Sequence, residues 1–491
     1  MERNSPQINT SNEKKASEFH HLISIIENSE NIKDRIESLH TLANLGVINE
    51  KYYNLLENLL ISDSNHKVRY VAANSLKELF LDKSFIPMKW SFKHESSVKC
   101  LIAITNTLGA IDNTKSKKFL LNELKNISIK KYKEHIDKIY SNYQLRTISS
   151  PELADILNNF HVIKFLKNNF GKIRYSLKRG KVVSLDLSNI NSHVFDWKLL
   201  KLPDFIGALK ELRKLDLKFN RIKNIPGSIK NLSSLNYLDL SYNKIKKLPT
   251  DFTTLRSLKY FNLKSNKISH LPEEIGCLSN LQTLNLRSNN LTALPKSITQ
   301  LKKLEELILH GNKLNTLPLS FSNTSMKVLE LGLNNFKRVP KCISGIKTLK
   351  ILGVEGNEIE KLPKWFGDLA SLEVLRLHNN DLTQLPESIG ALSELRELSL
   401  WNNNLKNLPQ SFSNLSNLKN LNLNWNNLET IPKNLPNNLE ILSLWGNKIQ
   451  KIPRSIENLR KLRILDLNFN KELNLSKKRI NLEKNGLIIY R

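Results

Sequence analysis

The residues of this sequence best suited to contacting another molecule are three tryptophans, Trp401, Trp425 and Trp445. The first stands in the stretch LSLWNNNLKNLP, residues 398–409, between an apolar residue and a run of asparagines. An indole ring offers a large apolar face and one N–H donor, but no acid, base or nucleophile. Such groups support non-covalent binding, so binding is the first kind of function to consider.

Motifs that carry catalysis or hold cofactors are missing from the sequence. SGIKT, residues 344–348, comes nearest to a phosphate-binding loop but lacks the glycine before its lysine. His94 in HESSV has no second histidine four residues later, and there is no Gly-x-Ser-x-Gly elbow. The pair His20-His21 lies in a helical pattern and is expected to be exposed. We therefore expect a non-enzyme that uses no cofactor and binds no metal.

Composition and cysteine usage favour a cytoplasmic protein. Apolar residues make up 40% and charged residues 25% of the 491 residues, which is ordinary for a globular chain. Cys100, Cys277 and Cys342 lie far apart and suggest neither disulfides nor a zinc site. The N-terminus is polar, and no stretch approaches the roughly 20 apolar residues that a membrane span needs. We expect no transmembrane segment.

From residue 212 onward the sequence repeats the pattern L-x-x-L-x-L-x-x-N-x-L-x-x-L-P-x-x-I-x-x-L. The period is 23 residues, with one copy of 22 and one of 21. This pattern resembles the leucine-rich repeat signature, which implies an α/β solenoid, a horseshoe of stacked parallel strands. The copies begin at Leu212, Leu235, Leu258, Leu281, Leu304, Met326, Leu349, Leu372, Leu395, Leu418, Leu439 and Leu462.

Each position of the repeat has a predicted place in this solenoid. Positions 3 to 8 should form a strand, with the residues at 4 and 6 in the core and those at 3, 5 and 7 on the concave face. The proline at position 15 suits a convex segment that is neither a strand nor a long helix. The asparagine at position 9 should satisfy main-chain groups where the chain leaves the strand. It occurs in every copy: Asn220, Asn243, Asn266, Asn289, Asn312, Asn334, Asn357, Asn380, Asn403, Asn426, Asn447 and Asn470.

The region before the repeats has helical patterns instead. Residues 1–16 are polar and predict a disordered tail, and residues 17–168 predict an all-α domain. The stretch DSNHKVRYVAANSLKELF resembles the second helix of a HEAT repeat, with Asp63 before the helix and Arg69 within it. Residues 33–46 look like a second copy, and a generic helical bundle is the alternative. The helices are expected at 18–28, 33–45, 51–61, 68–81, 97–108 and 116–124, with others as far as 166.

Both ends of the array carry predicted caps. Residues 169–211 should hold an N-terminal hairpin, around the turn Lys178-Arg179-Gly180, and an irregular first copy with Ile190 at the asparagine position. Regular repeats fill 212–470, and residues 471–491 should cover the C-terminal end of the core.

The repeat register places aromatic residues at both ends of the concave face and polar residues between them. Exposed clusters of Trp and Tyr are typical of protein interfaces, although mutual stacking that stiffens the face is the alternative. The predicted protein-binding residues are Phe219, Tyr237, Tyr242 and Tyr260 at the first end, His310, Glu330, Arg376 and His378 in the middle, and Trp401, Trp425, Trp445 and Phe469 at the far end.

The formal charge of +29 does not lie on the concave face. Residues 181–491 contain 47 basic and 27 acidic residues, yet positions 3, 5 and 7 carry five basic and seven acidic ones. A nucleic acid in the groove would need the opposite balance, so nucleic acid is an unexpected partner. A basic ridge just after the early strands is either a solvated face or a weak anion site: Arg221, Lys223, Lys244, Lys246, Lys247 and Lys267.

The Leu-Pro pair at positions 14–15, with Ile or Phe at 18, resembles the cytosolic Ras-group leucine-rich repeat proteins. These include the Ras suppressor protein, Ras-pathway scaffolds and the plant intracellular Ras-group family. The resemblance implies a scaffold or adaptor in small-GTPase signalling. Two alternatives remain open: a recognition subunit of an enzyme complex, such as a GTPase regulator or ubiquitin ligase, and a binder of anionic surfaces or nucleic acid through the outer basic face.

Overall fold

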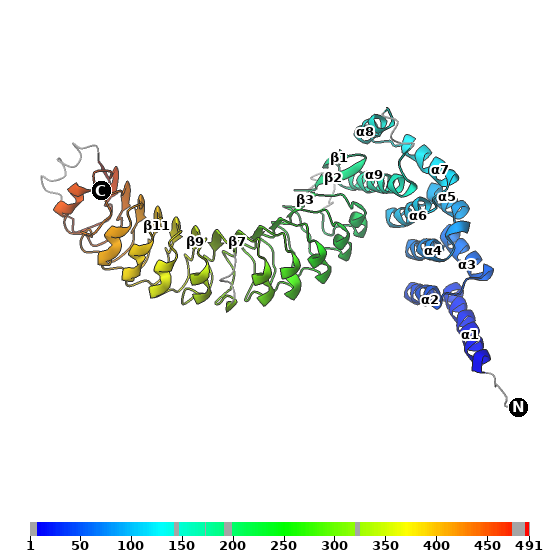
Figure 1. Ribbon diagram of the computed structural model, residues 1–491, viewed down its shortest axis with the longest axis horizontal. Helices are drawn as coiled ribbons and strands as arrows, with labels where there is room; N and C mark the ends of the chain where they lie inside the picture. The colour runs from blue at the N-terminus through cyan, green and yellow to red at the C-terminus, as the bar shows by residue number, and fades with distance from the viewer. Residues whose placement is uncertain are drawn as a thin grey trace. The chain divides into compact units, whose positions relative to one another are not determined.

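The computed structural model describes residues 7–141, 147–171, 173–190, 199–319, 325–473 and 487–490. The chain forms two compact units (Figure 1). The first comprises residues 1–186 and 203–213, and the second comprises 187–202 and 214–491. Of the tail expected at residues 1–16, residues 1–6 lie outside the described part, and a helix begins at Gln7.

The first unit is mainly helical, as the sequence predicts. Asparagines explain where several helices begin, because Asn31, Asn49, Asn65 and Asn113 each accept a hydrogen bond from a main-chain N–H of the first turn. The helices are α1 (Gln7–Asn28), α2 (Ile32–Leu45), α3 (Glu50–Ser62), α4 (His66–Leu79), α5 (Phe85–His94), α6 (Val98–Ala110), α7 (Thr114–Lys125), α8 (Lys130–Ser141) and α9 (Ser150–Phe170).

Helix α5 is absent from the sequence prediction. It is short, and Pro87 lies in its first turn, where the missing N–H costs no hydrogen bond. A proline in a ten-residue segment is usually a sign of a loop, which explains the omission.

The helices of this unit stack in pairs. Helices α1 and α2, α3 and α4, and α5 and α6 pack against each other, and α2, α4, α6 and α9 form a continuous layer. Ion pairs tie one pair to the next: Arg35 on α2 bonds to Asp63 before α4, and Arg69 on α4 bonds to Glu95 before α6. The core contains Leu39, among other apolar side chains.

The predicted hairpin belongs to this first unit. Strands β1 (Arg174–Lys178) and β2 (Lys181–Asp186) pair antiparallel, and Arg179 and Gly180 have the positive φ angles that the tight turn requires. The hydroxyl of Tyr132 donates to the Gly180 carbonyl, and Asn159 Oδ1 accepts from the Val182 N–H at 2.8 Å. The hairpin is therefore held by α8 and α9.

The second unit is a solenoid whose parallel strands are hydrogen-bonded in sequence order. Figure 1 shows the strands along the inner side of its arc and the short helical turns along the outer side. The strands are β3 (Lys214–Asp216), β4 (Tyr237–Asp239), β5 (Tyr260–Asn262), β6 (Thr283–Asn285), β7 (Glu306–Ile308), β8 (Val328–Glu330), β9 (Ile351–Gly353), β10 (Val374–Arg376), β11 (Glu397–Ser399), β12 (Asn420–Asn422), β13 (Ile441–Ser443), β14 (Ile464–Asp466) and β15 (Ile488–Tyr490).

These strands are shorter than predicted. They cover positions 3 to 5 of the repeat, and not 3 to 8. The reason is at position 8, where residues such as Phe219, Tyr242 and Trp425 have φ between 50° and 56°, in the left-handed region that ends an extended strand. Single hydrogen bonds still continue beyond each strand, as from the Phe219 N–H to the Ser241 carbonyl.

The predicted asparagine ladder is confirmed. Asn403 is buried, and its Nδ2 donates to the Leu400 and Leu377 carbonyls at 2.9 and 3.0 Å. Its Oδ1 accepts from the Leu382 N–H of the preceding repeat at 3.1 Å. All twelve asparagines at position 9 are buried, so they bond successive turns of the solenoid in its interior.

On the outer side, the position-15 proline usually precedes a short 3-10 helix. This agrees with the expected convex segment and orders the chain between strands. These turns include η4 (Gly227–Asn231), η5 (Thr250–Thr254), η6 (Glu273–Cys277), η7 (Lys296–Gln300), η9 (Lys341–Gly345), η10 (Lys364–Asp368), η11 (Glu387–Ala391), η12 (Gln410–Asn414) and η13 (Arg454–Asn458).

At the C-terminal end, β15 adds one more parallel strand beside β14. Most of the cap expected at 471–491 lies outside the described residues, as do residues 191–198 of the irregular first copy.

Candidate binding surface

Side chains at position 5 of the repeat are less exposed on the concave face than expected. Asp216 and Asp239 are buried, and the Oδ1 of each accepts a main-chain N–H two residues later. Asn422 does the same for the N–H of Asn424 at 3.0 Å. Aspartate and asparagine at this position therefore turn the chain at the end of the strand. Part of the acidic excess expected on the concave face is thus structural.

The aromatic cluster at the first end of the face is internally paired. The rings of Tyr237 and Tyr260 stack with centroids 4.5 Å apart, and those of Phe219 and Tyr242 stack at 4.4 Å. Burial raises the pKa of both Tyr237 and Tyr260, and nearby Asp239 raises it further. Lys214 lies 4.8 Å from the centre of the Tyr237 ring, so the Tyr237–Tyr260 pair is the covered part of this cluster, whereas Phe219 and Tyr242 are 46% and 38% exposed.

The cluster at the far end is more open. Trp425 and Trp445 meet edge to face at 4.8 Å, and Trp445 meets Phe469 at 5.4 Å. Trp425 is 48% and Phe469 66% exposed. Trp401 does not join them, because its ring stacks on His378 at 4.8 Å. The sequence register found these residues but could not find which rings pair.

One ion pair and one carboxylate–imidazole contact cross the middle of the face. Glu330 on β8 reaches across Gly353 on β9 to Arg376 on β10, with 2.7 Å between Oε1 and Nη1. Glu355 reaches across Gly332 to His310, where Oε1 and Nε2 are 3.4 Å apart. A Cβ at Gly353 would overlap a Glu330 carboxylate oxygen, and one at Gly332 would overlap the Glu355 carboxylate, so the two glycines make room for both contacts. The sequence analysis did not predict Glu355 as a residue of this strip. The signal that could have found it is glycine at outward positions of two adjacent repeats, which leaves room for a carboxylate to cross the face.

Burial determines the protonation of this strip. It raises the pKa of Glu330, although Arg376 opposes the change, and it raises the pKa of Glu355, with Glu330 adding to the effect. It lowers the pKa of His310, and with Arg376 it lowers the pKa of His378 to about 4. Both histidines are therefore neutral at pH 7. In the described part of the chain, Glu355 Oε2 is buried without a hydrogen-bond partner.

The basic ridge is exposed at every predicted position, Arg221, Lys223, Lys244, Lys246, Lys247 and Lys267. Exposed, interspersed cations of this kind commonly keep a protein soluble.

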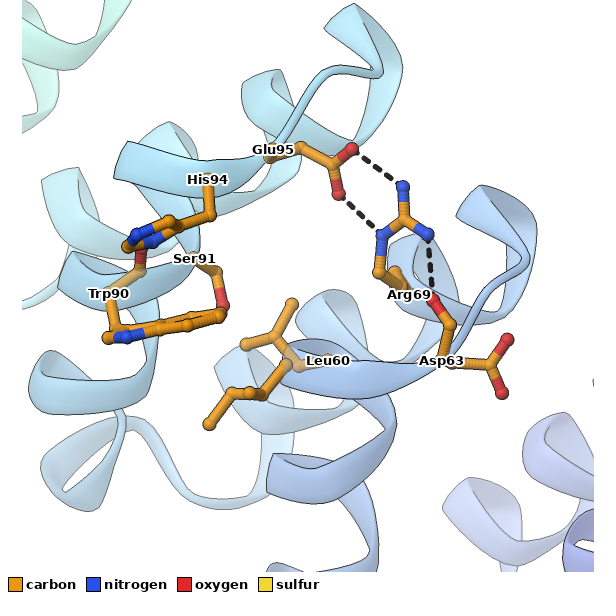
Figure 2. Close-up of a pocket in the computed structure, with 8 residues that line it drawn as sticks. Leu60, Asp63, Arg69, Trp90, Ser91, His94 and Glu95 are labelled. Carbon is orange, nitrogen blue, oxygen red and sulfur yellow. Dashed lines mark hydrogen bonds and ion pairs between the residues drawn. The ribbon is translucent and has the colours of Figure 1, made fainter.

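The first unit contains a pocket of about 220 Å³ between α3, α4 and α5 (Figure 2). Trp90 and His94 stack on one side, with ring centroids 4.1 Å apart, and Trp90 is 45% exposed. On the other side, Arg69 makes two hydrogen bonds of 2.8 Å to the carboxylate of Glu95.

The charged groups of this pocket are already paired. Burial alone would raise the pKa of Glu95, but the bonds from Arg69, Cys100 and Ser97 lower it to about 2. Arg69 also donates to the Asp63 and Ser64 carbonyls. Arg69 thus connects neighbouring helix pairs, and its guanidinium is already engaged and not available to an anion. Among the residues described, no group of His, Cys, Asp and Glu could hold a metal ion, and no helix is long and apolar enough to cross a membrane.

Stacked parallel strands, a buried asparagine ladder and convex 3-10 turns define a leucine-rich repeat solenoid. A family model described as a leucine-rich repeat region matches residues 250–332, 322–439 and 366–484, and a second leucine-rich repeat model matches 210–268. The chain belongs to the leucine-rich repeat family. No curated protein matches it.

Three solved structures show what the chain is similar to. A leucine-rich repeat protein of Leptospira interrogans is 36% identical, with 60% of this chain and 75% of that chain covered and a TM-score of 0.57. A structure described as a TDR receptor is 31% identical, covering 58% of this chain and 51% of its own, with a TM-score of 0.52. An internalin of Listeria monocytogenes shares the fold at 20% identity, with coverages of 67% and 94% and a TM-score of 0.54.

Proposed function

We propose that this protein is a non-catalytic scaffold that binds another protein on the concave face of its repeats. One observation carries the proposal: Trp425, Trp445 and Phe469 form a cluster whose outer members are about half exposed or more. Burying large aromatic rings supplies much of the binding energy at protein interfaces. That one of the similar structures is described as a receptor agrees with a binding role.

The helical unit is proposed as a second docking module of HEAT type. Its stacked helix pairs and the ion pairs Arg35–Asp63 and Arg69–Glu95, which recur from one pair to the next, support this assignment. Trp90 and Ile86, which are 45% and 67% exposed on α5, provide apolar contact area.

The identity of the protein partner is proposed from the Ras-group resemblance of the repeat. On this basis, a small GTPase or its regulator is the first partner to test. A recognition subunit of an enzyme complex would use the same face. Binding of nucleic acid or an anionic surface would instead use the exposed basic ridge, and its affinity should fall steeply with salt.

The test is affinity purification from cells, comparing the full chain with a Trp401→Ala/Trp425→Ala/Trp445→Ala variant and identifying bound proteins by mass spectrometry. A partner lost from the variant, while its thermal unfolding stays close to wild type, supports the proposal. A partner that is retained by the variant, or one that is released by salt alone, contradicts it.

A further inference from the structure

The concave surface around β12 carries an uncharged row of asparagines. Asn420, Asn422 and Asn424 occupy positions 3, 5 and 7 of one repeat, and all three are partly exposed. The neighbouring strands add Ser399 and Ser443 beside Asn422, in register. We call Asn420, Asn422 and Asn424 the asparagine row.

Internal hydrogen bonds fix the direction of two of these amides. The Oδ1 of Asn422 accepts the Asn424 N–H at 3.0 Å, and the Oδ1 of Asn424 accepts the Trp445 N–H at 2.8 Å. Their acceptor oxygens are thus occupied by the main chain, so the Nδ2 groups remain as donors. The row therefore presents N–H donors in a fixed orientation.

The spacing of these donors matches an extended peptide. Alternate residues of a strand lie roughly 6.6 Å apart, and the edge of an extended peptide repeats its carbonyls at the same interval. Acceptors for the N–H groups of such a peptide are also present: the amide oxygen of Asn420 within the row and the hydroxyl of Ser443 beside Asn422.

Tryptophans border the row without covering it. Trp401 stacks on His378, on the far side of β11, and Trp445 packs on Trp425 and Phe469. Asn424 lies between these two rings in the repeat register. Positions 3, 5 and 7 of β11 to β14 contain no lysine or arginine, while Glu397 and Asp466 stand at the borders. Anionic ligands are disfavoured there, which excludes a nucleic acid or an acidic peptide by charge.

We propose that the asparagine row binds the main-chain carbonyls of an extended, non-acidic peptide segment of the partner, with apolar side chains against Trp401 and Trp445. This inference rests on the proposed function and specifies the form of the partner. Sequence specificity then comes from the tryptophans, and the row supplies affinity from groups that every peptide has.

The test uses random linear peptides displayed on phage and selected on the purified full chain. Peptides that bind are then measured against an Asn422→Asp variant, which retains the oxygen needed by Asn424 and removes the N–H donor. Affinity should fall roughly tenfold, as expected for loss of a buried hydrogen-bond partner. Asn285→Asp is the matched control, because Asn285 Oδ1 makes the same bond to the Arg287 N–H at 3.0 Å but lies far from the tryptophans. It should change affinity less than about twofold.

Asn420→Ala gives a second measurement. In the described part of the chain, the side-chain amide of Asn420 makes no internal hydrogen bond, and its main-chain N–H, which donates to the Arg396 carbonyl, is kept in the variant. The variant should therefore fold and bind more weakly. Unchanged affinity in both row variants, with loss in Trp425→Ala, overturns the asparagine row and leaves the protein-binding function in place. Selection of no linear peptide, or of a glycan in a parallel array, also overturns the row. Peptides that bind equally well after loss of both Trp425 and Trp445 overturn the proposed function itself.

Discussion

At the first end of the concave face, Tyr237 and Tyr260 lie ring against ring with an interplanar angle of 4°, and Lys214 and Lys264 lie over the aromatic pairs. At the far end, Trp445 meets both Trp425 and Phe469 edge to face. Both clusters lie over the leucine core and share position 8 of the repeat, but the first adds tyrosines at position 3 and the second adds Trp445 at position 7. A parallel stack covers ring faces, whereas edge contacts leave them available. On the proposed function, the Tyr237–Tyr260 stack mainly stabilises the solenoid, and the tryptophan cluster is the part that binds.

The largest expected effects come from truncating core leucines, and they test whether the core is equally well packed beneath both clusters. Leu238→Ala beneath the tyrosines and Leu421→Ala beneath the tryptophans each empty a buried site. Each should lower the free energy of unfolding by about 2–5 kcal/mol, measured by denaturant titration. A much smaller loss at Leu421 would mean that the far end is locally loose, and the open cluster would then reflect poor packing.

The aromatic clusters themselves should separate binding from stability. Trp425→Ala/Trp445→Ala should weaken partner binding by about 2 kcal/mol or more, as for interface hot spots, with a small change in unfolding. Tyr237→Ala/Tyr260→Ala should show the reverse, a stability loss with nearly unchanged affinity, measured by calorimetry on the same preparations. Equal effects of the two double variants on binding would remove the distinction.

The strip between the clusters should respond to pH. Burial raises the pKa of Glu355 in the folded state, so the charged carboxylate is unfavourable at neutral pH. This cost disappears as the pH falls through the raised pKa towards the ordinary value of 4.5. Glu355→Gln should therefore unfold at a higher temperature than wild type at neutral pH, and the gap should close as the pH is lowered.

The control for this pH profile is Glu397→Gln, because Glu397 is an exposed carboxylate of the same face. It should give a gap near zero at each pH. A Glu355→Gln variant that is less stable than wild type at neutral pH would show that the contact with His310 outweighs the cost of burial.

The smallest effect concerns the cations over the first cluster. Lys264 lies 5.2 Å from the centre of the Tyr242 ring, and an exposed cation–π contact contributes about 0.5–1 kcal/mol. Lys264→Met should lower stability by that amount or less in thermal unfolding, with no effect on partner binding. A loss of binding here would show that the first cluster also belongs to the interface.

Particular residues show which features of the fold and site can be predicted from the sequence. The period of 23 fixed the place of Leu400 in the core and of Asn403 in the ladder, because each role repeats and each repeat confirms the others. Helix α5 was missed because Pro87 hides its pattern, and Glu355 because its role depends on two glycines in neighbouring repeats. Neither helix α5 nor the role of Glu355 recurs from repeat to repeat, so no periodic pattern marks them.

By itself, the sequence determined the solenoid, its register and the set of side chains that could form its concave face, since these follow from hydrophobic periodicity and from one asparagine and one proline per turn. The tertiary structure alone decided which neighbours meet: that Trp401 stacks on His378, that Asp216 turns inward, and that Glu330 spans a glycine to reach Arg376. Those outcomes depend on the rotamers and volumes of residues one repeat apart, which compete for the same space after the strands have stacked.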